Sequence, residues 1–400
     1  MKGRQMTAAW IAGSDAPEKT VIRIGFMPLT DCAPLVMASV LGLDEKYGIK
    51  IVLSREHSWS GMRDRLLRGE IDCAHVLYGL LYGVEMGIGA PAGSASTPMA
   101  VLMNLSRNGQ AVTLSRELAR QGVVNLATLA AQVRRGTRRF TFAHTFPTGN
   151  HAMLLYYWLA SAGIDPLRDV QMVTVPPSQM AANLAAGHMD GFAAGEPWSG
   201  RAVLDGSGYT AATSQDIWPD HPGKALGATA AFVDAHPHAC RSLIAAVLEA
   251  GRWIDESDER REAAAEVLAS PAFVNAERGT IAARLCGHYE NGLGKRWDDP
   301  DPLQFYAGGE ATFPYLSDGM WFLTQHRRWG LLRQDPDYLA VATRVNRVGL
   351  YREAAVLANT PASASLLRRS VLMDGRAWGG QDPEGYVASF PIHKLVLAGA

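Results

Sequence analysis

Short apolar runs alternate with helical periodicity through the first part of the chain. The run VIRIGFM begins at Val21, a second run covers residues 49–54, and a third covers residues 71–75. Helical segments separate the runs, and Ser58 or Ser60 would cap the helix that precedes the third run. Because strands that alternate with helices pair in one direction, this part predicts a parallel sheet with helices on its faces.

The same alternation starts again after two strand-like runs, residues 99–105 and 111–114, which are expected to cross out of the first lobe. The periodicity then changes several times between the helical and the extended type, which predicts a second α/β lobe. Its expected elements are a helix over 118–133, a strand over 139–143, a helix over 150–162, a strand over 170–175, a helix over 178–186 and a strand over 190–194.

These patterns place the chain in the α/β class, with two lobes and a helical C-terminal part. We expect lobe 1 to contain residues 21–110 and 225–355, the C-terminal helices included, and lobe 2 to contain residues 111–224. Residues 1–20 are predicted to be a disordered leader, and residues 356–400 a C-terminal tail. Two lobes joined by two crossing strands form a cleft that closes on a small ligand by a hinge motion.

The stretch MDGFAAGEPWSG, residues 189–200, has the pattern of a strand, a tight turn and the start of a helix. Gly195 is expected to adopt a turn conformation that other residues rarely adopt, and Pro197 suits the first position of a helix. A helix N-terminus carries unpaired N–H groups and the positive end of a dipole, so this junction is a candidate anion site. Many such turns bind nothing, and the stretch alone does not decide.

Composition limits the classes of function. The chain has 400 residues and 48% apolar residues, which is enough for more than one domain. Its net charge of −1, with both signs interspersed, does not favour a broad basic surface for direct nucleic-acid binding. No segment reaches the roughly 20 uninterrupted apolar residues of a membrane span.

Motifs for catalysis or metal binding are not found in the sequence. The four cysteines have no C-x-x-C spacing, and His57, His75 and His144 do not form a metal-ligand pattern with nearby carboxylates. There is no G-x-S-x-G motif and no phosphate-binding G-x-x-x-x-G-K-[ST] motif. We expect no metal, no cofactor and no enzyme activity.

The most specific signal lies in seven stretches between about residues 21 and 330. They are IGFMPLTDCAPLV, SREHSWSGMRD, LSRNGQAVTLS, TFAHTFPTGNH, VPPSQMAANLAAGHMDGFAAGEPW, DIWPDHPGKALG and FYAGGEATFPYLSDGMWFLTQHRRWG. In this order and spacing they resemble the nitrate/nitrite- and bicarbonate-binding proteins of ABC transporters. The resemblance implies the type II periplasmic-binding-protein fold, in which two α/β lobes enclose a ligand cleft.

The resemblance also implies where the oxyanion pocket lies. A small planar anion such as nitrate has weakly basic oxygens, so it needs several N–H donors and one cation. Taken alone, such residues often have a role other than ligand binding, such as packing, capping a helix, or lying in a polar turn or a solvated loop. The implied residues are Trp59 with its indole N–H, Gln110 with its amide, His151 with a ring N–H, Gly195 with its backbone N–H and Lys224 with its ammonium group.

Glu196 lies beside the implied pocket and would repel an anion if its carboxylate pointed inward. We expect this carboxylate to face a basic partner or the N-terminus of the helix that follows. Similar donors satisfy nitrate and nitrite, so the choice between them stays open. Bicarbonate fits less well because it also presents a proton that needs an acceptor.

The N-terminal residues affect the choice among the family's functions. The first 19 residues contain an apolar run only at residues 8–12, shorter than the apolar region of a secretory signal, and no lipid-attachment cysteine. The resemblance is then nearest to the cytoplasmic nitrate/nitrite sensors of NasS type, which in the family hold an RNA-binding antiterminator of NasT type inactive until the anion binds. We expect a cytoplasmic sensor of nitrate or nitrite that controls nitrate assimilation genes through such a partner.

Two alternatives stay open. One is the substrate-binding component of a nitrate/nitrite or bicarbonate ABC transporter. The other is an enzyme on the same fold, such as a pyrimidine-precursor synthase. The enzyme would need a cofactor lysine or a His and Cys cluster in the cleft, and the sequence has no such cluster.

Overall fold

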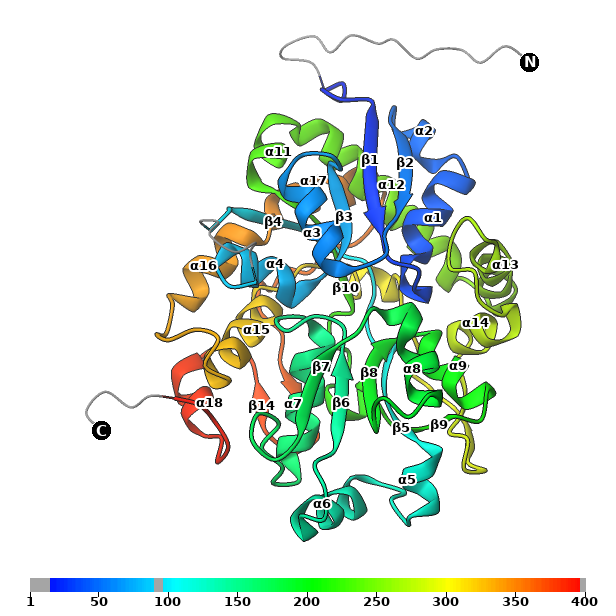
Figure 1. Ribbon diagram of the computed structural model, residues 1–400. Coiled ribbons are helices and arrows are strands. Elements are labelled where there is room, and N and C mark those ends of the chain that lie inside the picture. The colour runs from blue at the N-terminus through cyan, green and yellow to red at the C-terminus, as the bar shows by residue number, and fades with distance from the viewer. Residues whose placement is uncertain (1–14, 90–95, 396–400) are drawn as a thin grey trace.

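Residues 15–89 and 96–395 are described in the computed structural model, and they form two lobes that each contain a five-stranded sheet (Figure 1). The first sheet has the strand order β2-β1-β3-β10-β4, and the second has the order β7-β6-β8-β5-β9. Residues 1–14 of the expected leader and residues 396–400 of the expected tail lie outside the described residues. Among the described residues, no helix has the length and apolar character that a membrane crossing requires.

The first lobe follows the predicted alternation of strands and helices. Ser58 caps the helix that precedes β3, since its hydroxyl accepts the Gly61 N–H at 3.1 Å. The strands of the sheet are β1 (Val21–Phe26), β2 (Lys50–Arg55), β3 (Cys73–Leu77), β4 (Met99–Asn104) and β10 (Lys224–Thr229). The helices are η1 (Thr30–Cys32), α1 (Ala33–Val40), α2 (Leu43–Lys46), α3 (Trp59–Leu67), α4 (Tyr78–Glu85), α11 (Ala230–Ala235) and α12 (Pro237–Asp255).

The second lobe repeats the pattern. Its strands are β5 (Gln110–Ser115), β6 (Thr141–His144), β7 (Gln171–Thr174), β8 (Gly191–Gly195) and β9 (Gly208–Thr213). Its helices are α5 (Arg116–Arg120), α6 (Leu126–Arg135), α7 (Asn150–Ser161), η2 (Pro177–Gln179), α8 (Met180–Ala185), α9 (Trp198–Leu204) and α10 (Ser214–Ile217).

The C-terminal part is mostly helical and lies along both lobes (Figure 1). Helix α15 lies between the lobes, with α4 of the first lobe and α7 of the second both in contact with it. The elements are α13 (Asp258–Ala269), α14 (Arg278–Leu285), β11 (His288–Glu290), β12 (Arg296–Asp298), η3 (Ala307–Gly309), α15 (Leu316–Arg328), α16 (Tyr338–Val345), α17 (Val348–Leu357), β13 (Ser370–Val371), β14 (Ala377–Trp378) and α18 (Pro383–Ala388).

The prediction of a parallel sheet is wrong for one strand of each sheet. In the first sheet, β1 is parallel to β2 and β3, whereas β10 is antiparallel to β3 and β4. In the second sheet, β6 is parallel to β7 and β8, whereas β5 is antiparallel to β8 and β9. Strands β5 and β10 are those by which the chain enters one lobe from the other, so each arrives from the opposite direction.

The helix predicted over residues 118–133 is two helices. Helix α5 ends before Gly122, whose φ of 84° lies in the left-handed region. Helix α6 begins after Asn125, whose side chain accepts the Thr128 N–H at 2.9 Å. The segment 178–186 is likewise divided into the short helix η2 and α8. Turn and cap chemistry at Gly122 and Asn125 explains the break between α5 and α6.

Two segments cross between the lobes side by side. The Leu105 N–H donates to the Lys224 carbonyl at 2.7 Å, and the Gly223 N–H donates to the Ser106 carbonyl at 2.7 Å. The outgoing segment ends at Gly109, whose φ is 78° and whose Cβ, if present, would lie 2.5 Å from a Leu303 methyl carbon. The two crossing segments therefore place the first residue of β5 and the first residue of β10 in the same region between the lobes.

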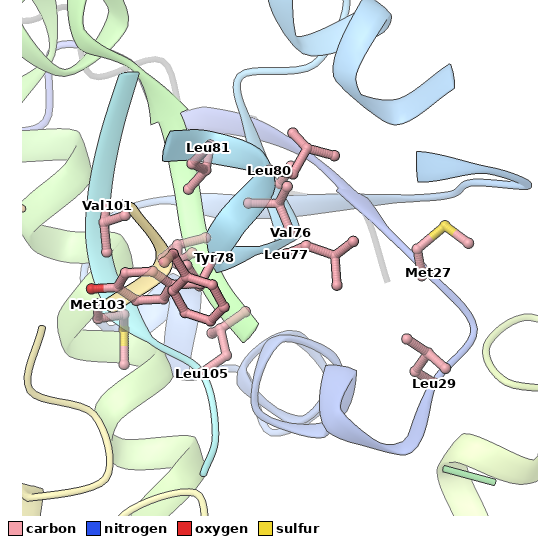
Figure 2. Close-up of a cluster of buried hydrophobic side chains, with 14 of the residues drawn as sticks. Met27, Leu29, Val76, Leu77, Tyr78, Leu80, Leu81, Val101, Met103 and Leu105 are labelled. Carbon is pink, nitrogen blue, oxygen red and sulfur yellow. The ribbon is translucent and has the colours of Figure 1, made fainter. Parts of the chain in front are cut away.

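Buried apolar side chains form a core cluster that extends through both lobes. Figure 2 shows the part of this core beside the first sheet. Met27 and Leu29 come from the connection after β1, and Leu77 and Tyr78 come from the junction of β3 and α4. Leu105 belongs to the outgoing crossing segment, so the crossing itself is anchored in the core.

Helix α15 packs very closely against α4. A Cβ added to Gly319 of α15 would lie 1.8 Å from the Tyr82 hydroxyl oxygen of α4. That hydroxyl donates to Asn346 Oδ1 at 2.9 Å, and Asn346 Nδ2 donates to the Tyr78 hydroxyl at 2.8 Å. Glycine at position 319 therefore makes room for a tyrosine that a buried polar network holds in place.

We expect Gly319→Ala to lower the free energy of unfolding by about 1–3 kcal/mol, because the added methyl group overpacks this contact. Gly349→Ala is the matched control. Gly349 lies in α17, has no left-handed φ, and its added Cβ would meet nothing within 4 Å. The control should be neutral or stabilising by up to about 1 kcal/mol through helix propensity. Chemical denaturation measures both, and equal midpoints for the two variants would contradict this packing.

Candidate functional site

Gln110 and Gly195 lie opposite each other on adjacent strands of the second sheet. Gln110 begins β5, Gly195 ends β8, and the two pair in antiparallel register. The Glu196 N–H donates to the Gly109 carbonyl at 3.2 Å, so Gln110 and Gly195 form a non-hydrogen-bonded pair and the Gly195 N–H points away from β5. The Gln110 side chain is buried, and neither of its amide atoms has a partner among the described residues.

His151 lies in the first turn of α7 and is fully buried. Its Nδ1 is 2.6 Å from the Thr145 hydroxyl, and its Nε2 has no hydrogen-bond partner in the described part of the chain. Burial lowers the pKa of His151 well below its usual value, and the charge of Lys224 lowers it further. The ring is therefore neutral, with one nitrogen that donates and one that accepts.

Gly195 is needed for space and not for a turn. Its φ is not in the left-handed region, so the predicted turn conformation is wrong. A Cβ at this position would lie 3.3 Å from a Leu29 methyl carbon and 3.6 Å from His151 Nε2. Any larger residue would fill the space between Leu29 of the first lobe and the His151 imidazole of the second lobe.

The N-terminus of α9 already holds a carboxylate. The sequence predicted Pro197 as the first helical residue of α9. In the structure Pro197 is instead the N-cap of this helix. A Glu196 oxygen accepts the Gly200 N–H at 2.9 Å, and the other oxygen lies 3.2 Å from Nε of the buried Arg284. The expectation that Glu196 faces a basic partner or the helix N-terminus is confirmed, since its carboxylate contacts both. The predicted anion site therefore cannot use this helix end, and it depends on the residues before it.

Trp59 contributes from the first lobe. It is the first residue of α3, which Ser58 caps, and its side chain is buried. The indole Nε1 has no hydrogen-bond partner within residues 15–89 and 96–395. The indole lies beside His75, with 6.1 Å between the ring centroids.

Lys224 begins β10 and is fully buried, so it is not a solvated loop residue. Its Nζ lies 2.7 Å from one oxygen of Asp31, and His75 Nε2 lies 2.9 Å from the other oxygen. The Met27 N–H donates to His75 Nδ1 at 3.4 Å, so Nδ1 accepts and the Nε2–H donates to Asp31. A buried cation is thus held by a carboxylate that a neutral histidine orients.

The charges within this group have definite protonation states. Burial alone would raise the pKa of Asp31, but the charge of Lys224 and the contact with His75 outweigh it and hold the pKa well below its usual range. Burial lowers the pKa of His75, although Asp31 acts in the opposite direction. Asp31 is therefore ionised and His75 neutral at neutral pH, and the charges of Lys224 and Asp31 cancel.

Asp31 and His75 were missed as site residues by the sequence analysis. A signal for Asp31 was present, because it is the one charged residue in the apolar stretch IGFMPLTDCAPLV and is buried there. A charged side chain in such a stretch requires a partner. The partner, Lys224, is 193 residues away in the sequence, and only the fold brings the two together.

The second lobe is held against the first around this group. The Trp198 indole donates to the Pro28 carbonyl at 3.0 Å, and the Thr30 N–H donates to the Glu196 carbonyl at 2.8 Å. Asn150, next to His151, donates to two carbonyls of the returning crossing segment at 2.9 and 2.7 Å. The structure therefore represents a closed cleft, which explains why every predicted site residue is buried.

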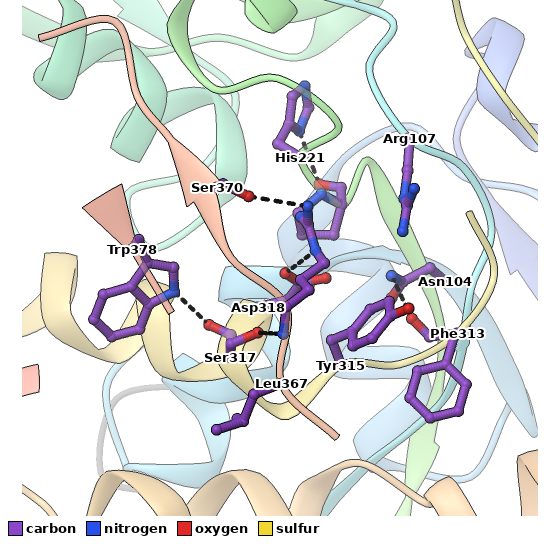
Figure 3. A network of polar contacts seen from close by, with 12 residues as sticks. Asn104, Arg107, His221, Phe313, Tyr315, Ser317, Asp318, Leu367, Ser370 and Trp378 are labelled. Atoms are coloured by element: carbon purple, nitrogen blue, oxygen red, sulfur yellow. Dashed lines mark hydrogen bonds and ion pairs between the residues drawn. The ribbon is translucent and has the colours of Figure 1, made fainter. Parts of the chain in front are cut away.

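A polar network lies next to the crossing segments (Figure 3). Arg107 of the outgoing segment donates to the Glu310 carbonyl, and His221 of the returning segment is buried beside it. Arg368 contacts Asp318 at 2.7 Å through its Nε. This network contacts both crossing segments and supports the hinge.

The arrangement presents unpartnered N–H donors from both lobes beside one buried cation. Buried polar groups in proteins are normally hydrogen-bonded, so several orphaned donors in one region indicate a place for an acceptor. The unpartnered nitrogens are Trp59 Nε1, Gln110 Nε2 and His151 Nε2, and the last of these donates only in the tautomer that has its proton there. Within the described residues, no group of His, Cys, Asp and Glu side chains is arranged to hold a metal ion.

Known proteins show the same fold. The chain matches the NMT1-like family over residues 15–269. The nitrate/nitrite binding protein NrtA of Synechocystis sp. is 35% identical over 98% of this chain and 89% of that protein. NrtA of Synechococcus elongatus is 36% identical over 94% of this chain and 87% of that protein.

The crystal structure of the periplasmic nitrate-binding protein NrtA from Synechocystis superposes with a TM-score of 0.89 at 35% identity, covering 94% of this chain and all of that one. The likeness confirms the predicted type II periplasmic-binding-protein fold. The relatives are named as binding proteins, in agreement with the expectation that the chain is not an enzyme.

Removal of the charge on Asp31 should leave Lys224 buried without a counter-ion. We expect Asp31→Asn to lower the free energy of unfolding by about 3–5 kcal/mol at pH 7, because the uncompensated charge stays in the core. The exposed pair Arg201 and Asp205 is the control, and Asp205→Asn should cost less than about 1 kcal/mol.

The pH dependence of this loss has a definite sign. The folded-state pKa of Asp31 is lowered, so its contribution is complete above the unfolded-state pKa of about 3.9 and is lost as the pH falls below it. Denaturation of wild type and Asp31→Asn should give a constant difference between pH 7 and pH 5 that narrows below pH 4. A difference that grows on acidification would contradict the assigned charge state.

Proposed function

The chain belongs to the NMT1-like family and, within it, to the nitrate/nitrite-binding solute-binding proteins of NrtA type, and on this premise we propose that it binds nitrate or nitrite in the cleft between its lobes. One observation carries the proposal. Trp59 Nε1, Gln110 Nε2 and His151 Nε2 are buried without partners among the described residues, the charge of the buried Lys224 acts on His151, and Gly195 leaves space beside the imidazole.

The donor set suits an anion that only accepts hydrogen bonds. Each oxygen of nitrate or nitrite can accept a hydrogen bond from an N–H group. These anions have no proton of their own that would need an acceptor in the pocket. Lys224 has one contact with Asp31 and carries further N–H bonds that can face the ligand. Because the site is buried, these interactions are not weakened by solvent.

The charge of the pocket disfavours a doubly charged ligand. Lys224 and Asp31 cancel each other, and both neighbouring histidines, His75 and His151, are neutral. A monoanion then adds one net charge that the surrounding dipoles must stabilise. A dianion such as sulfate would add two to a dry site, at a much larger desolvation cost.

Ligand binding is coupled to closure because the donors come from both lobes. Trp59 and Lys224 belong to the first lobe, and Gln110, His151 and Gly195 belong to the second. An anion held between them contacts the full set only when the cleft is closed. The ligand therefore shifts the population toward the closed form, with the crossing segments as the hinge between lobes.

Two partners could use this closure. The names of the relatives support a transporter component, since they describe binding proteins for nitrate and nitrite. The sensor function, with a cytoplasmic location and an RNA-binding antiterminator of NasT type, shares the same cleft and stays a prediction. The transporter component needs a surface that the closed form presents, whereas the sensor needs a partner surface that fits only the open form.

Gel filtration with a purified NasT-type protein separates the two functions. The sensor predicts a complex in the absence of anion that dissociates when nitrate or nitrite is added. The transporter component predicts no complex under either condition. A complex that is indifferent to the anion would contradict the coupling of closure to partner release.

Calorimetric titration of the desalted chain with nitrate, nitrite, bicarbonate and sulfate in separate runs tests the ligand. We expect a dissociation constant of about 1–100 μM for nitrate or nitrite, equivalent to roughly −5 to −8 kcal/mol, and no measurable binding of sulfate. Silence toward nitrate and nitrite from a folded sample would contradict the proposal.

Trp59→Phe should weaken nitrate binding by about tenfold, because it removes one N–H donor to a charged ligand and keeps the aromatic ring. Trp329→Phe is the matched control. Its indole N–H is also buried without a partner in the described part of the chain, but it packs beside Tyr156 and Arg328 at the end of α15. Titration of both variants should show a loss only for Trp59→Phe, and equal losses would remove Trp59 from the pocket.

Nitrate affinity should be constant between pH 6 and pH 8. Burial holds the pKa of His151 well below the ordinary value, so the ring proposed to contact the ligand gains no proton in this range. An exposed histidine in the pocket would instead titrate near pH 6.5 and make binding tighter on acidification. Titrations at three pH values in one buffer system measure this, and a tenfold gain in affinity at pH 6 would contradict the assigned states.

A further inference from the structure

Thr145 follows β6 and is buried directly beneath His151. We propose that its hydroxyl sets which nitrogen of His151 carries the proton and thereby selects anions without a proton of their own. The inference rests on the proposed function, since it concerns the same pocket. It adds Thr145 as a positioning residue that acts on the ligand through the imidazole.

The geometry gives Thr145 one role in hydrogen bonding. Its Oγ1 lies 2.6 Å from His151 Nδ1, and Thr145 is 3% exposed. The opposite nitrogen, Nε2, lies 3.6 Å from the Cβ position of Gly195 and has no partner among the residues that the structure describes. Thr145 therefore contacts the ring on the side away from Gly195.

The direction of the proton follows from what each group can do. A neutral imidazole has one donor and one acceptor, and a hydroxyl has one proton. If Nδ1–H donated to Thr145, the hydroxyl proton would have to find another acceptor in a buried region, and His151 is the partner that the structure gives it. A buried donor without a partner is costly, so Thr145 donates to Nδ1 and the N–H lies on Nε2.

The tautomer determines what the ring offers to a ligand. An Nε2–H group donates to an oxygen of nitrate or nitrite. The other tautomer would present a lone pair, which repels these oxygens but accepts the hydroxyl proton of bicarbonate. Thr145 thus favours the unprotonated oxyanions.

The oxygens of Asp31 and Gln110 are the other acceptors near the proposed site, and neither residue holds a free acceptor fixed toward the ligand. Both oxygens of Asp31 are engaged, one by Lys224 and the other by His75. Gln110 carries both an NH₂ group and an oxygen, and a rotation of its amide can turn either one to the ligand. In contrast, the hydrogen bond with Thr145 fixes whether His151 Nε2 donates to the ligand or accepts from it.

The test compares Thr145→Val with Thr145→Ser in the full-length chain. Valine keeps the size of the side chain and removes the hydroxyl, whereas serine keeps the hydroxyl. Calorimetric titrations with nitrate and with bicarbonate at pH 8 give the affinity ratio for each variant. Nitrogen-15 NMR of the anion-free protein, with His151 assigned through His151→Gln, reports the tautomer directly.

We expect Thr145→Val to lower the nitrate-to-bicarbonate affinity ratio by about tenfold, equivalent to one hydrogen bond to a charged ligand, and to shift the ring away from the Nε2–H tautomer. Thr145→Ser should match wild type in both measurements. An equal weakening of both anions with an unchanged tautomer would mean that Thr145 only supports the fold, and would overturn the inference.

The failure of the inference differs from the failure of the proposed function. If wild type binds no nitrate or nitrite, the proposed function is wrong and the selection falls with it. If wild type binds nitrate and Thr145→Val keeps both the ratio and the tautomer, only the role of Thr145 is wrong. The NMR measurement decides the tautomer in either case because it needs no bound anion.

Discussion

The buried ion pair between Lys224 and Asp31 is the interaction on which the arrangement of the site depends. It places a cation at the start of β10, where the chain returns from the second lobe, with no exposure to solvent. Such a charge is stable in the interior only because Asp31 neutralises it and His75 holds the second oxygen of Asp31. The pair sets the net charge of the region to zero, which disfavours a doubly charged ligand.

The two crossing segments connect this pair to the motion of the protein. They hydrogen-bond to each other and end at Gln110 on one side and Lys224 on the other, so the hinge and the pocket share residues. The same region carries the donors of Asn150 to the returning segment and of Trp198 to the first lobe. A ligand that completes the hydrogen bonds of the pocket therefore adds to contacts that already favour the closed cleft.

Much of the fold could be predicted from the sequence because its signals are local. The Ser58 cap, the helix that begins at residue 150 and the strands next to the cleft all follow from short-range periodicity and cap chemistry. The reversed strands β5 and β10 could not be predicted in this way, since their direction depends on a crossing between lobes. The sequence predicted a glycine-specific turn at Gly195. A glycine is needed there instead because Leu29 and His151, which lie far away in the sequence, approach it closely.

The site was predicted less completely than the fold. The five residues implied by family resemblance are brought to one region, whereas no sequence pattern joined Asp31 to Lys224 or Thr145 to His151. Those contacts decide the protonation and charge of the pocket, and they form only when the sheets and α7 have packed. The residues that contact a ligand leave a signal in the sequence, whereas the groups that orient them have to be read from the structure.

The most direct test of the pocket is the indole N–H signal of Trp59 in a nitrogen-15 correlation spectrum, followed as nitrate is added. Trp59→Phe identifies the signal by its disappearance. If the pocket binds the anion, this signal shifts downfield in a saturable way with nitrate and does not move with sulfate, while the Trp329 signal stays in place. A Trp59 signal that ignores nitrate, or that moves equally with sulfate, would contradict an anion held between the lobes.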